Sequence, residues 1–173
     1  MRRLRYSVAA SLDGFIAGPE GEFDWIPMDD AIDFGAFMSK FDTAIMGRRT
    51  YDLVRSQQEQ SAVEGMRTYV FSRTLEPGEN AGVTIVADDA ARFVAGLKEE
   101  DGKDIWLFGG GVMFRSLHDA GLVDRVEVGI VPVLIGSGIP LLPPGDKRVR
   151  LRHVKNEAFP SGIILGKYDV LNE

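Results

Sequence analysis

The sequence contains no cysteine, which removes disulfide bonds and thiolate chemistry from consideration. It has only two histidines, His118 and His153, and they fall on different predicted elements. Metal sites in proteins need clustered histidine, cysteine or carboxylate ligands, so we expect no metal. Ser116, His118 and Asp119 are residue types of a catalytic triad, but residues two apart on a helix do not face each other.

Long apolar runs and excess basic charge are also missing. No stretch approaches the roughly 18 apolar residues of a membrane span, and the basic N-terminal segment lacks the apolar core of a signal peptide. With 20 Lys and Arg against 26 Asp and Glu, the formal net charge is −6 at pH 7. Such a balance disfavours binding to nucleic acid. We therefore expect a cytoplasmic protein that binds neither membranes nor nucleic acids.

The remaining composition is that of an ordinary globular protein. Of its 173 residues, 45% are hydrophobic and 27% are charged. This length supports a sizeable core, and we find no internal repeat, linker or low-complexity segment. We therefore predict a single domain over residues 1–173.

Short apolar runs alternate with helical patterns through the first two thirds of the chain, as in α/β proteins. In the last third the predicted strands are longer, and "PSG" at 160–162 is typical of a hairpin turn. We therefore predict a mainly parallel sheet with antiparallel C-terminal strands. The predicted strands are 4–11, 43–47, 67–72, 83–87, 104–108, 124–134, 150–159 and 162–171, and the predicted helices cover 29–41, a segment from 48, a segment capped by Asp88 or Asp89, and a segment with Met113, Leu117 and Ala120.

Three segments lie at strand-to-helix junctions: "MGRRTY" (46–51), "FSRT" (71–74) and "FGGGVM" (108–113). Ligands of open α/β sheets bind beyond the carboxyl ends of the strands, where helix N-termini offer free N–H groups to phosphate. Each segment alone is explained as well by surface arginines and turn glycines, but three at equivalent junctions favour a site for a polyanion such as a dinucleotide. Phe114 stands where G-x-G-x-x-G requires its last glycine, which disfavours a standard Rossmann domain.

Four stretches resemble the dihydrofolate reductase-like superfamily: "AASLDGFIAG", "AIMGRRTYD", "VFSR" and "WLFGGGVMFRSLHDAGLVDRVEVGIVPVLIGSGIPLL". Within it, the chain resembles the branch named for the C-terminal reductase domain of the bifunctional riboflavin-biosynthesis deaminase/reductase. The resemblance runs from about residue 3 to 170 and implies a three-layer α/β/α fold. The deaminase half is absent, so we expect a stand-alone reductase domain.

The resemblance implies NADPH as the hydride donor. It also implies that the peptide between Gly109 and Gly110 is cis. The cofactor-binding residues implied are Ala9 and Ile16 at the nicotinamide, Gly47, Arg48, Arg49 and Thr50 at the phosphates, Ser72 and Arg73 at the adenosine 2′-phosphate, and Gly109, Gly110, Gly111, Val112 and Met113 at the pyrophosphate and nicotinamide.

The substrate side departs from the folate reductases. Their acid early in the first helix aligns with Ala31, which Asp30 and Asp33 flank. Asp30 and Asp33 share a helical stripe with Phe34, so either acid is a candidate proton donor, although both also suit the first turn of a helix. We place Trp25 at the mouth of the substrate pocket and Phe34 in it, with core packing as an equal alternative for Trp25.

The arginine that holds the folate glutamate aligns with Met66, so a true dihydrofolate reductase is not expected. We predict an NADPH-dependent reductase of a small heterocycle, carbonyl or imine. The alternatives are the 5-amino-6-(5-phosphoribosylamino)uracil reductase of riboflavin synthesis and a nucleotide-binding regulatory module without turnover. The apolar strands "RVEVGIVPVL" and "GIILGKYDVL", together with the resemblance, also predict a homodimer.

Overall fold

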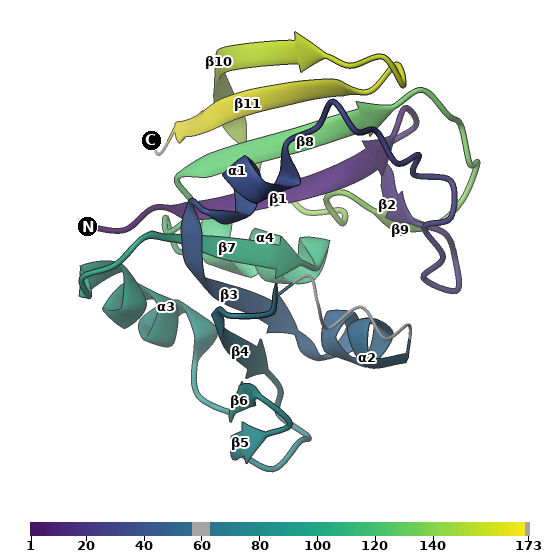
Figure 1. Cartoon of the computed structure of the whole chain (residues 1–173). Coiled ribbons are helices and arrows are strands. Elements are labelled where there is room, and N and C mark those ends of the chain that lie inside the picture. The colour runs from purple at the N-terminus through teal and green to yellow at the C-terminus, as the bar shows by residue number, and fades with distance from the viewer. Residues whose placement is uncertain (57–62, 172–173) are drawn as a thin grey trace.

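One large mixed sheet organises the protein in the computed structural model, which describes residues 1–56 and 63–171 (Figure 1). Its pairs β1–β8, β1–β7, β7–β3, β3–β4 and β4–β6 are parallel, whereas β8–β11, β11–β10 and β6–β5 are antiparallel. The predicted arrangement is thereby confirmed. In spatial order the strands are β10 (Arg150–Ala158), β11 (Ile164–Leu171), β8 (Arg125–Val131), β1 (Leu4–Ser11), β7 (Asp104–Gly109), β3 (Phe41–Gly47), β4 (Arg67–Phe71), β6 (Val83–Val86) and β5 (Gly78–Asn80).

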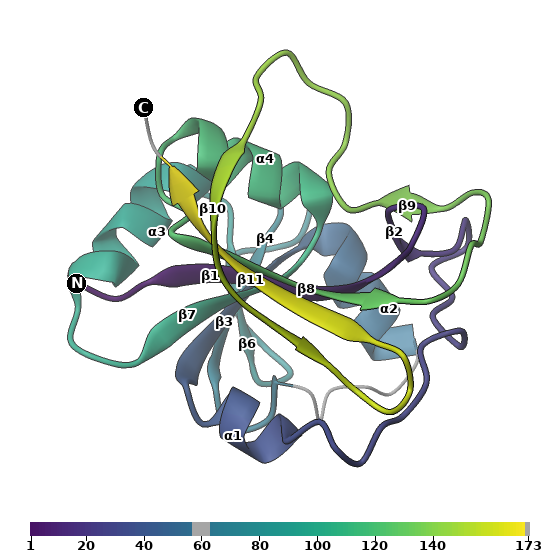
Figure 2. The same cartoon turned by 90° about the horizontal axis from the view of Figure 1, so that it is seen from above.

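Helices cover both faces of this sheet, as a three-layer α/β/α fold requires (Figure 2). On one face α3 (Ala90–Glu99) and α4 (Gly111–Asp119) bury Val94 and Leu117 against Leu4 and Leu107. On the other lie α1 (Phe34–Met38) and α2 (Arg48–Ser56), and α2 packs Tyr51 into a second buried cluster. Asp89 caps α3, because its side chain accepts a hydrogen bond from the N–H of Arg92.

The helix predicted over residues 29–41 is wrong in extent, because only Phe34–Met38 are helical and Phe41 begins β3. The apolar spacing that suggested a long helix has another cause. Phe37 and Phe41 lie on different elements but pack ring to ring, with centroids 5.1 Å apart. A helical repeat and an aromatic cluster shared by a helix and a strand produce the same spacing in the sequence.

Three short strands were not predicted. β2 (Phe15–Ala17) and β9 (Ile139–Pro140) form a small antiparallel sheet of their own, and β5 extends one edge of the main sheet. Two or three residues are too few for an alternating pattern to stand out. Among residues 1–56 and 63–171, no helix has the length and apolar character that crossing a membrane requires.

Candidate functional site

A large cleft lies on the sheet face that carries α1 and α2. Its volume is ≈ 2010 Å³, which exceeds the roughly 300–1,000 Å³ of a pocket for one small molecule. The walls come from β1, β7, β8 and β11, from both of these helices, and from the chain between β2 and α1. The cleft therefore has room for a dinucleotide and a second ligand together.

Strand register organises the floor of this cleft into rows. Ser7 pairs with Glu127, and Glu127 pairs with Lys167, so one row crosses β1, β8 and β11; we call these three residues the polar row. The adjacent row lies two residues away on each of these strands and consists of Ala9, Gly129 and Leu165. All six residues line the cleft. A polar strip thus lies directly beside an apolar one.

The three consecutive glycines connect β7 to α4 at one end of the cleft. Gly109 ends the strand, Gly110 is the N-cap of α4, and Gly111 opens the helix, as predicted. The peptide between Gly109 and Gly110 is trans, so the expected cis bond is wrong. The chain reverses instead through the backbone of Gly110, whose φ of 102° is rarely accessible to other residues.

Two helix N-termini open into the same region. The N-cap Gly110 makes no side-chain hydrogen bond, so the first N–H groups of α4 lack a side-chain partner. Gly47 immediately precedes α2, and a Cβ placed on it would meet no heavy atom within 4 Å. Free N–H groups beside open space form a cradle suited to phosphate groups.

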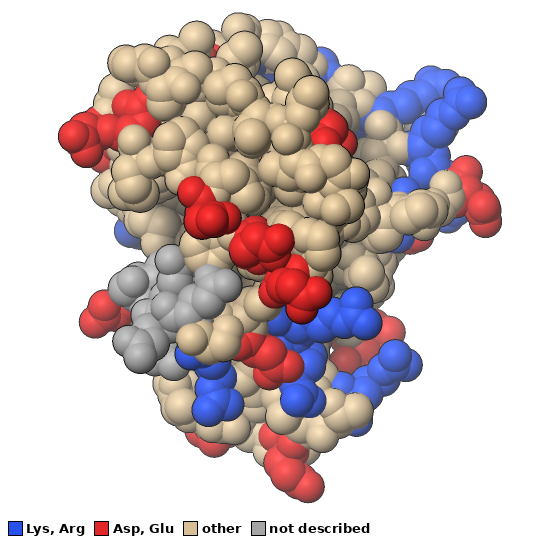
Figure 3. Space-filling model, turned by 90° about the vertical axis from the view of Figure 1, so that its right-hand side faces the viewer, with Lys and Arg blue, Asp and Glu red and all other residues tan. Residues whose placement is uncertain are grey.

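Arginines surround this cradle. Arg48 is partly engaged, because it binds Asp52 and Thr74, each at 2.8 Å. Arg49 and Arg73 are exposed and form no hydrogen bond or ion pair with any residue in the described part of the chain. Figure 3, which faces the side on which α2 lies, shows Lys and Arg side chains gathered below the middle and acidic side chains directly above them. Within the described part of the chain, both guanidinium groups are therefore free for an anionic ligand.

The structure brings all residues predicted for the cofactor to one cleft. Their roles there stay predictions. Ser72 is buried, and its hydroxyl oxygen accepts hydrogen bonds from the N–H groups of Thr74 and Leu75, which fixes the turn that contains Arg73. The cleft-lining residues of the prediction are Ala9, Ile16, Gly47, Arg48, Arg49, Thr50, Ser72, Arg73, Gly109, Gly110, Gly111, Val112 and Met113.

The residues predicted for the substrate side are more scattered. Asp33 and Phe34 line the cleft at its exposed rim, whereas Asp30 and Trp25 are not among its lining residues. Asp33 is the N-cap of α1, and its carboxylate accepts a hydrogen bond of 2.8 Å from the N–H of Ala36. The indole of Trp25 donates to the carbonyl oxygen of Glu22. Asp33 therefore caps the N-terminus of α1, which was the alternative to its role as a proton donor.

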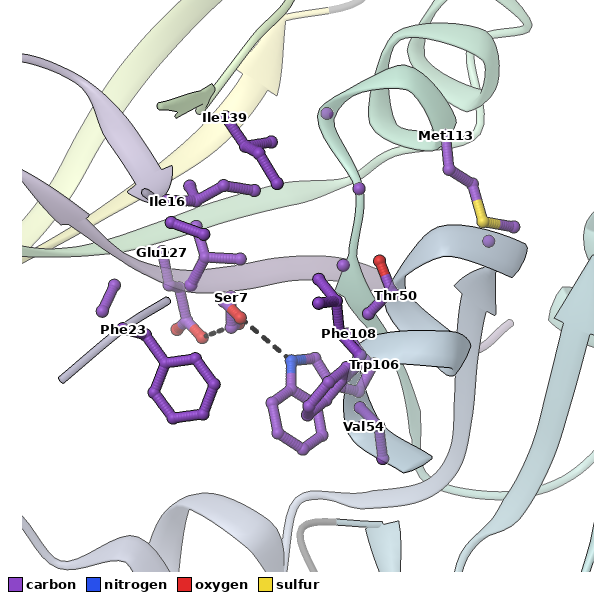
Figure 4. A pocket seen from close by; sticks show the side chains of 18 of the residues that line it. Ser7, Ile16, Phe23, Thr50, Val54, Trp106, Phe108, Met113, Glu127 and Ile139 are labelled. Carbon is purple, nitrogen blue, oxygen red and sulfur yellow. Dashed lines mark hydrogen bonds between the residues drawn. The ribbon is translucent and has the colours of Figure 1, made fainter. Parts of the chain in front are cut away.

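The polar row itself was missed by reasoning from the sequence. Glu127 is 2% exposed, and both of its oxygens accept hydrogen bonds from Nη2 of Arg5, at 2.8 and 2.7 Å. Ser7 donates to Oε2 of Glu127 at 2.8 Å, and the indole of Trp106 donates to the carbonyl oxygen of Ser7 at 3.0 Å. Figure 4 shows Glu127, Ser7 and Trp106 joined in this way on the wall of the cleft.

Lys167 completes the polar row from β11. Its Nζ lies 4.0 Å from Oε1 of Glu127, and its side chain is 23% exposed. Burial lowers the pKa of the Lys167 ammonium below its ordinary value, and the charge of Glu127 opposes that shift. The alternation of β1 placed Ser7 and Ala9 on one face, but no local signal indicated which later strands lie beside them.

Aromatic rings form the wall next to the polar row. Trp106 is in contact with Phe37 of α1 and Phe108 of β7, with ring centroids 5.4 and 4.7 Å apart, and all three line the cleft. Such a wall suits a flat, partly apolar ligand. The cleft thus has two ends, a cradle of free N–H groups at the glycines and an aromatic compartment with a buried ion pair.

Comparisons with known proteins identify the family of this chain. The family model described as the RibD C-terminal domain matches residues 2–165. The uncharacterized protein YyaP of Bacillus subtilis (strain 168) is 34% identical over 174 residues, which cover 94% of this chain and 92% of that protein.

Solved structures confirm the fold. A proposed riboflavin biosynthesis protein from Shewanella sp. PV-4 superposes with a TM-score of 0.84 at 26% identity, covering 99% of this chain and 100% of that one. A dihydrofolate reductase from Enterococcus faecalis, complexed with NADP(H) and the compound RAB-propyl, superposes with a TM-score of 0.71 at 18% identity, covering 98% of this chain and 97% of that one. The latter likeness concerns the fold alone.

Proposed function

The chain belongs to the RibD C-terminal domain family, and on that premise we propose that it is an NADPH-dependent reductase of a small heterocyclic, carbonyl or imine substrate. The observation that carries the proposal is the division of one cleft into two chemically different ends. Two helix N-termini and two arginines that have no partner among the described residues favour a dinucleotide at one end. The aromatic compartment and the polar row favour a second, flat ligand at the other.

The residues at the glycine end fit a nicotinamide dinucleotide. The open backbone at Gly47 and the uncapped start of α4 would hold the two phosphates, and Arg49 and Arg73 would bind the remaining negative charge. Gly110 lets the ligand approach the main chain closely. When bound, NADPH would supply hydride, while the protein positions the reactants and excludes water.

Two other functions are distinguishable from this one. The likeness to a proposed riboflavin biosynthesis protein favours the 5-amino-6-(5-phosphoribosylamino)uracil reductase as the second candidate. A regulatory nucleotide-binding module would use the cradle without turnover. The test combines equilibrium titration with NADPH and NADH and a turnover assay on pterins, quinones, imines, aldehydes and the phosphoribosylamino-uracil. Tight NADPH binding without any turnover would favour the module, and absence of NADPH binding would contradict the proposal.

Arg73 is expected to select NADPH over NADH. A charge-assisted hydrogen bond is worth about 1.5–3 kcal/mol, which corresponds to roughly ten- to a hundredfold in affinity. Arg73→Ala should therefore weaken NADPH by this factor and NADH much less, as measured by fluorescence titration. Arg92→Ala, which removes an exposed arginine outside the cleft, is the matched control. Equal weakening of both cofactors by Arg73→Ala would show that Arg73 does not recognise the 2′-phosphate.

We also propose that the protein forms a homodimer through its C-terminal strands. β10 lies at the edge of the sheet and is exposed along its whole length, and Leu151 and Val154 on it are 40% and 46% exposed. An exposed apolar edge is a liability unless it is covered. Light scattering at tens of micromolar should give twice the chain mass of 19.0 kDa.

The double variant Leu151→Asp/Val154→Asp is expected to run as a monomer. Met28→Asp changes an apolar side chain that is 86% exposed and lies between β2 and α1, outside the C-terminal strands, so it should leave the assembly intact. A monomeric wild-type protein under the same conditions would refute the dimer.

A further inference from the structure

The polar row lies one step from the place where the nicotinamide would sit. Ala9, expected beside the nicotinamide, and Ser7, the first residue of the polar row, are two residues apart on β1 and face the same side. Two residues along a strand span about 6.6–6.8 Å, and neighbouring strands are about 4.8 Å apart. A planar substrate stacked beside the nicotinamide would therefore lie over Ser7, Glu127 and Lys167.

Of the three side chains in the polar row, only the Lys167 ammonium has protons that are free to be donated to a substrate. The hydroxyl group of Ser7 donates its hydrogen bond to Glu127, and the guanidinium group of Arg5 donates hydrogen bonds to Glu127 and Asp104. The Glu127 carboxylate accepts three hydrogen bonds and acts as an acceptor. Nζ of Lys167 forms no hydrogen bond with a residue of the described segments, and its ion-pair partner is 4.0 Å away.

The acids expected to donate the proton are poorly placed for it. Asp30 does not line the cleft, and Asp33 is exposed at the rim with Oδ1 bound to the N–H that it caps. Neither belongs to the sheet floor beside Ala9. Lys167 reaches the cleft from β11, where its register opposite Glu127 fixes the direction of its side chain.

We propose that Lys167 is the proton donor of the reductase, held in place by Glu127. The inference rests on the proposed function. The hydride, with its electron pair, adds to the carbon of the substrate C=O or C=N bond, and the π electrons move to the heteroatom. That atom forms a bond to a proton from Nζ of Lys167, which becomes a neutral amine and is reprotonated from solvent. NADPH leaves as NADP⁺, so electrons and protons balance.

The surroundings of Lys167 suit this task. A general acid works best when its pKa lies near the working pH, and burial moves the pKa of Lys167 down from the ordinary 10.5. The charge of Glu127 opposes this downward shift of the Lys167 pKa. Among the described residues, the cations Lys40, Arg5 and Lys155 add to the downward shift.

The first test is kinetic. In Lys167→Met, single-turnover hydride transfer should slow by roughly 10²–10⁴-fold, the usual contribution of a general acid, while NADPH affinity stays within a few fold. The wild-type rate should fall as pH rises through the lowered pKa of Lys167, and this limb should vanish in Lys167→Met. Lys167→Arg keeps the charge but does not release a proton, so it should also be slow. Added ethylamine should restore the rate of Lys167→Ala.

Lys155→Met is the matched control, because Lys155 pairs with Lys167 in the neighbouring strand but does not line the cleft. It should keep the wild-type rate and the falling limb of the pH profile. The midpoint of that limb should move only slightly upward, because Lys155 is one of the cations that lower the pKa of Lys167. A second measurement does not depend on turnover: NMR titration of ¹³Cε-labelled lysines, with the Lys167 signal assigned by its absence in Lys167→Met, should give a midpoint below 10.5.

The outcomes separate the two proposals. A wild-type protein that reduces no compound of the panel overturns the proposed function, and with it the role of Lys167. Wild-type turnover with an unchanged rate or an unchanged pH limb in Lys167→Met overturns the role of Lys167 alone. An NMR midpoint at or above 10.5, or rescue by arginine but not by ethylamine, also overturns it and would indicate a purely electrostatic role.

Discussion

Replacing Gly110 with alanine is expected to lower the affinity for NADPH at least tenfold while the protein stays folded. Gly110 has φ 102° and ψ 109°, a conformation that an alanine adopts only with roughly 1–3 kcal/mol of strain. The new Cβ would lie 3.6 Å from Oγ1 of Thr50 and 3.9 Å from Cβ of Met113, which are ordinary contacts. Strain, rather than a clash inside the protein, should therefore displace the backbone that starts α4.

Affinity is measured by isothermal titration and folding by thermal denaturation of the free protein. Gly121→Ala is the matched control, because Gly121 also has a positive φ, 71°, and lies outside the cleft at the far end of α4. A Cβ added to Gly121 would meet no heavy atom within 4 Å. It should lose stability by a similar amount and bind NADPH normally. If Gly110→Ala also binds NADPH normally, the glycines are only a turn and the cofactor does not lie against them.

Much of the fold was predictable because its signals are local. The continuous apolar run of β7 and the alternation of β1 each occupy one short stretch of sequence, and so does the Asp89 cap of α3. The helix at 29–41 was misjudged because Phe37 and Phe41 contact each other in space from different elements. A pattern in one dimension does not separate these two causes.

The two ends of the cleft differ in the same way. The cofactor end is built from consecutive residues such as Gly109–Gly111, each at a strand-to-helix junction that the sequence marks. The polar row takes Ser7 from near the start of the chain, Glu127 from its last third and Lys167 from near its end. Strand order and register bring these residues together, and neither is marked in the sequence near any of them.

The largest loss of stability is expected when Arg5, the buried partner of Glu127 in the polar row, is replaced. Arg5 is 5% exposed, and its guanidinium binds both oxygens of Glu127 and, at 3.0 Å, Oδ2 of Asp104. It also lies over the ring of Phe41, with Cζ 4.8 Å from the centroid. Removing one partner of a buried pair leaves the other charge without compensation in a region from which water is excluded.

Arg5→Met is therefore expected to lower the free energy of unfolding by about 3–5 kcal/mol, measured by urea denaturation at a fixed protein concentration. Arg152→Met removes an arginine that is 68% exposed and bound to Asp169, and it should cost no more than about 1 kcal/mol. The double variant Arg5→Met/Glu127→Leu should recover part of the loss, because it removes the uncompensated carboxylate as well. If Arg5→Met is as stable as the wild type, Arg5 does not compensate the charge of Glu127. The same conclusion would follow if the double variant is less stable than Arg5→Met.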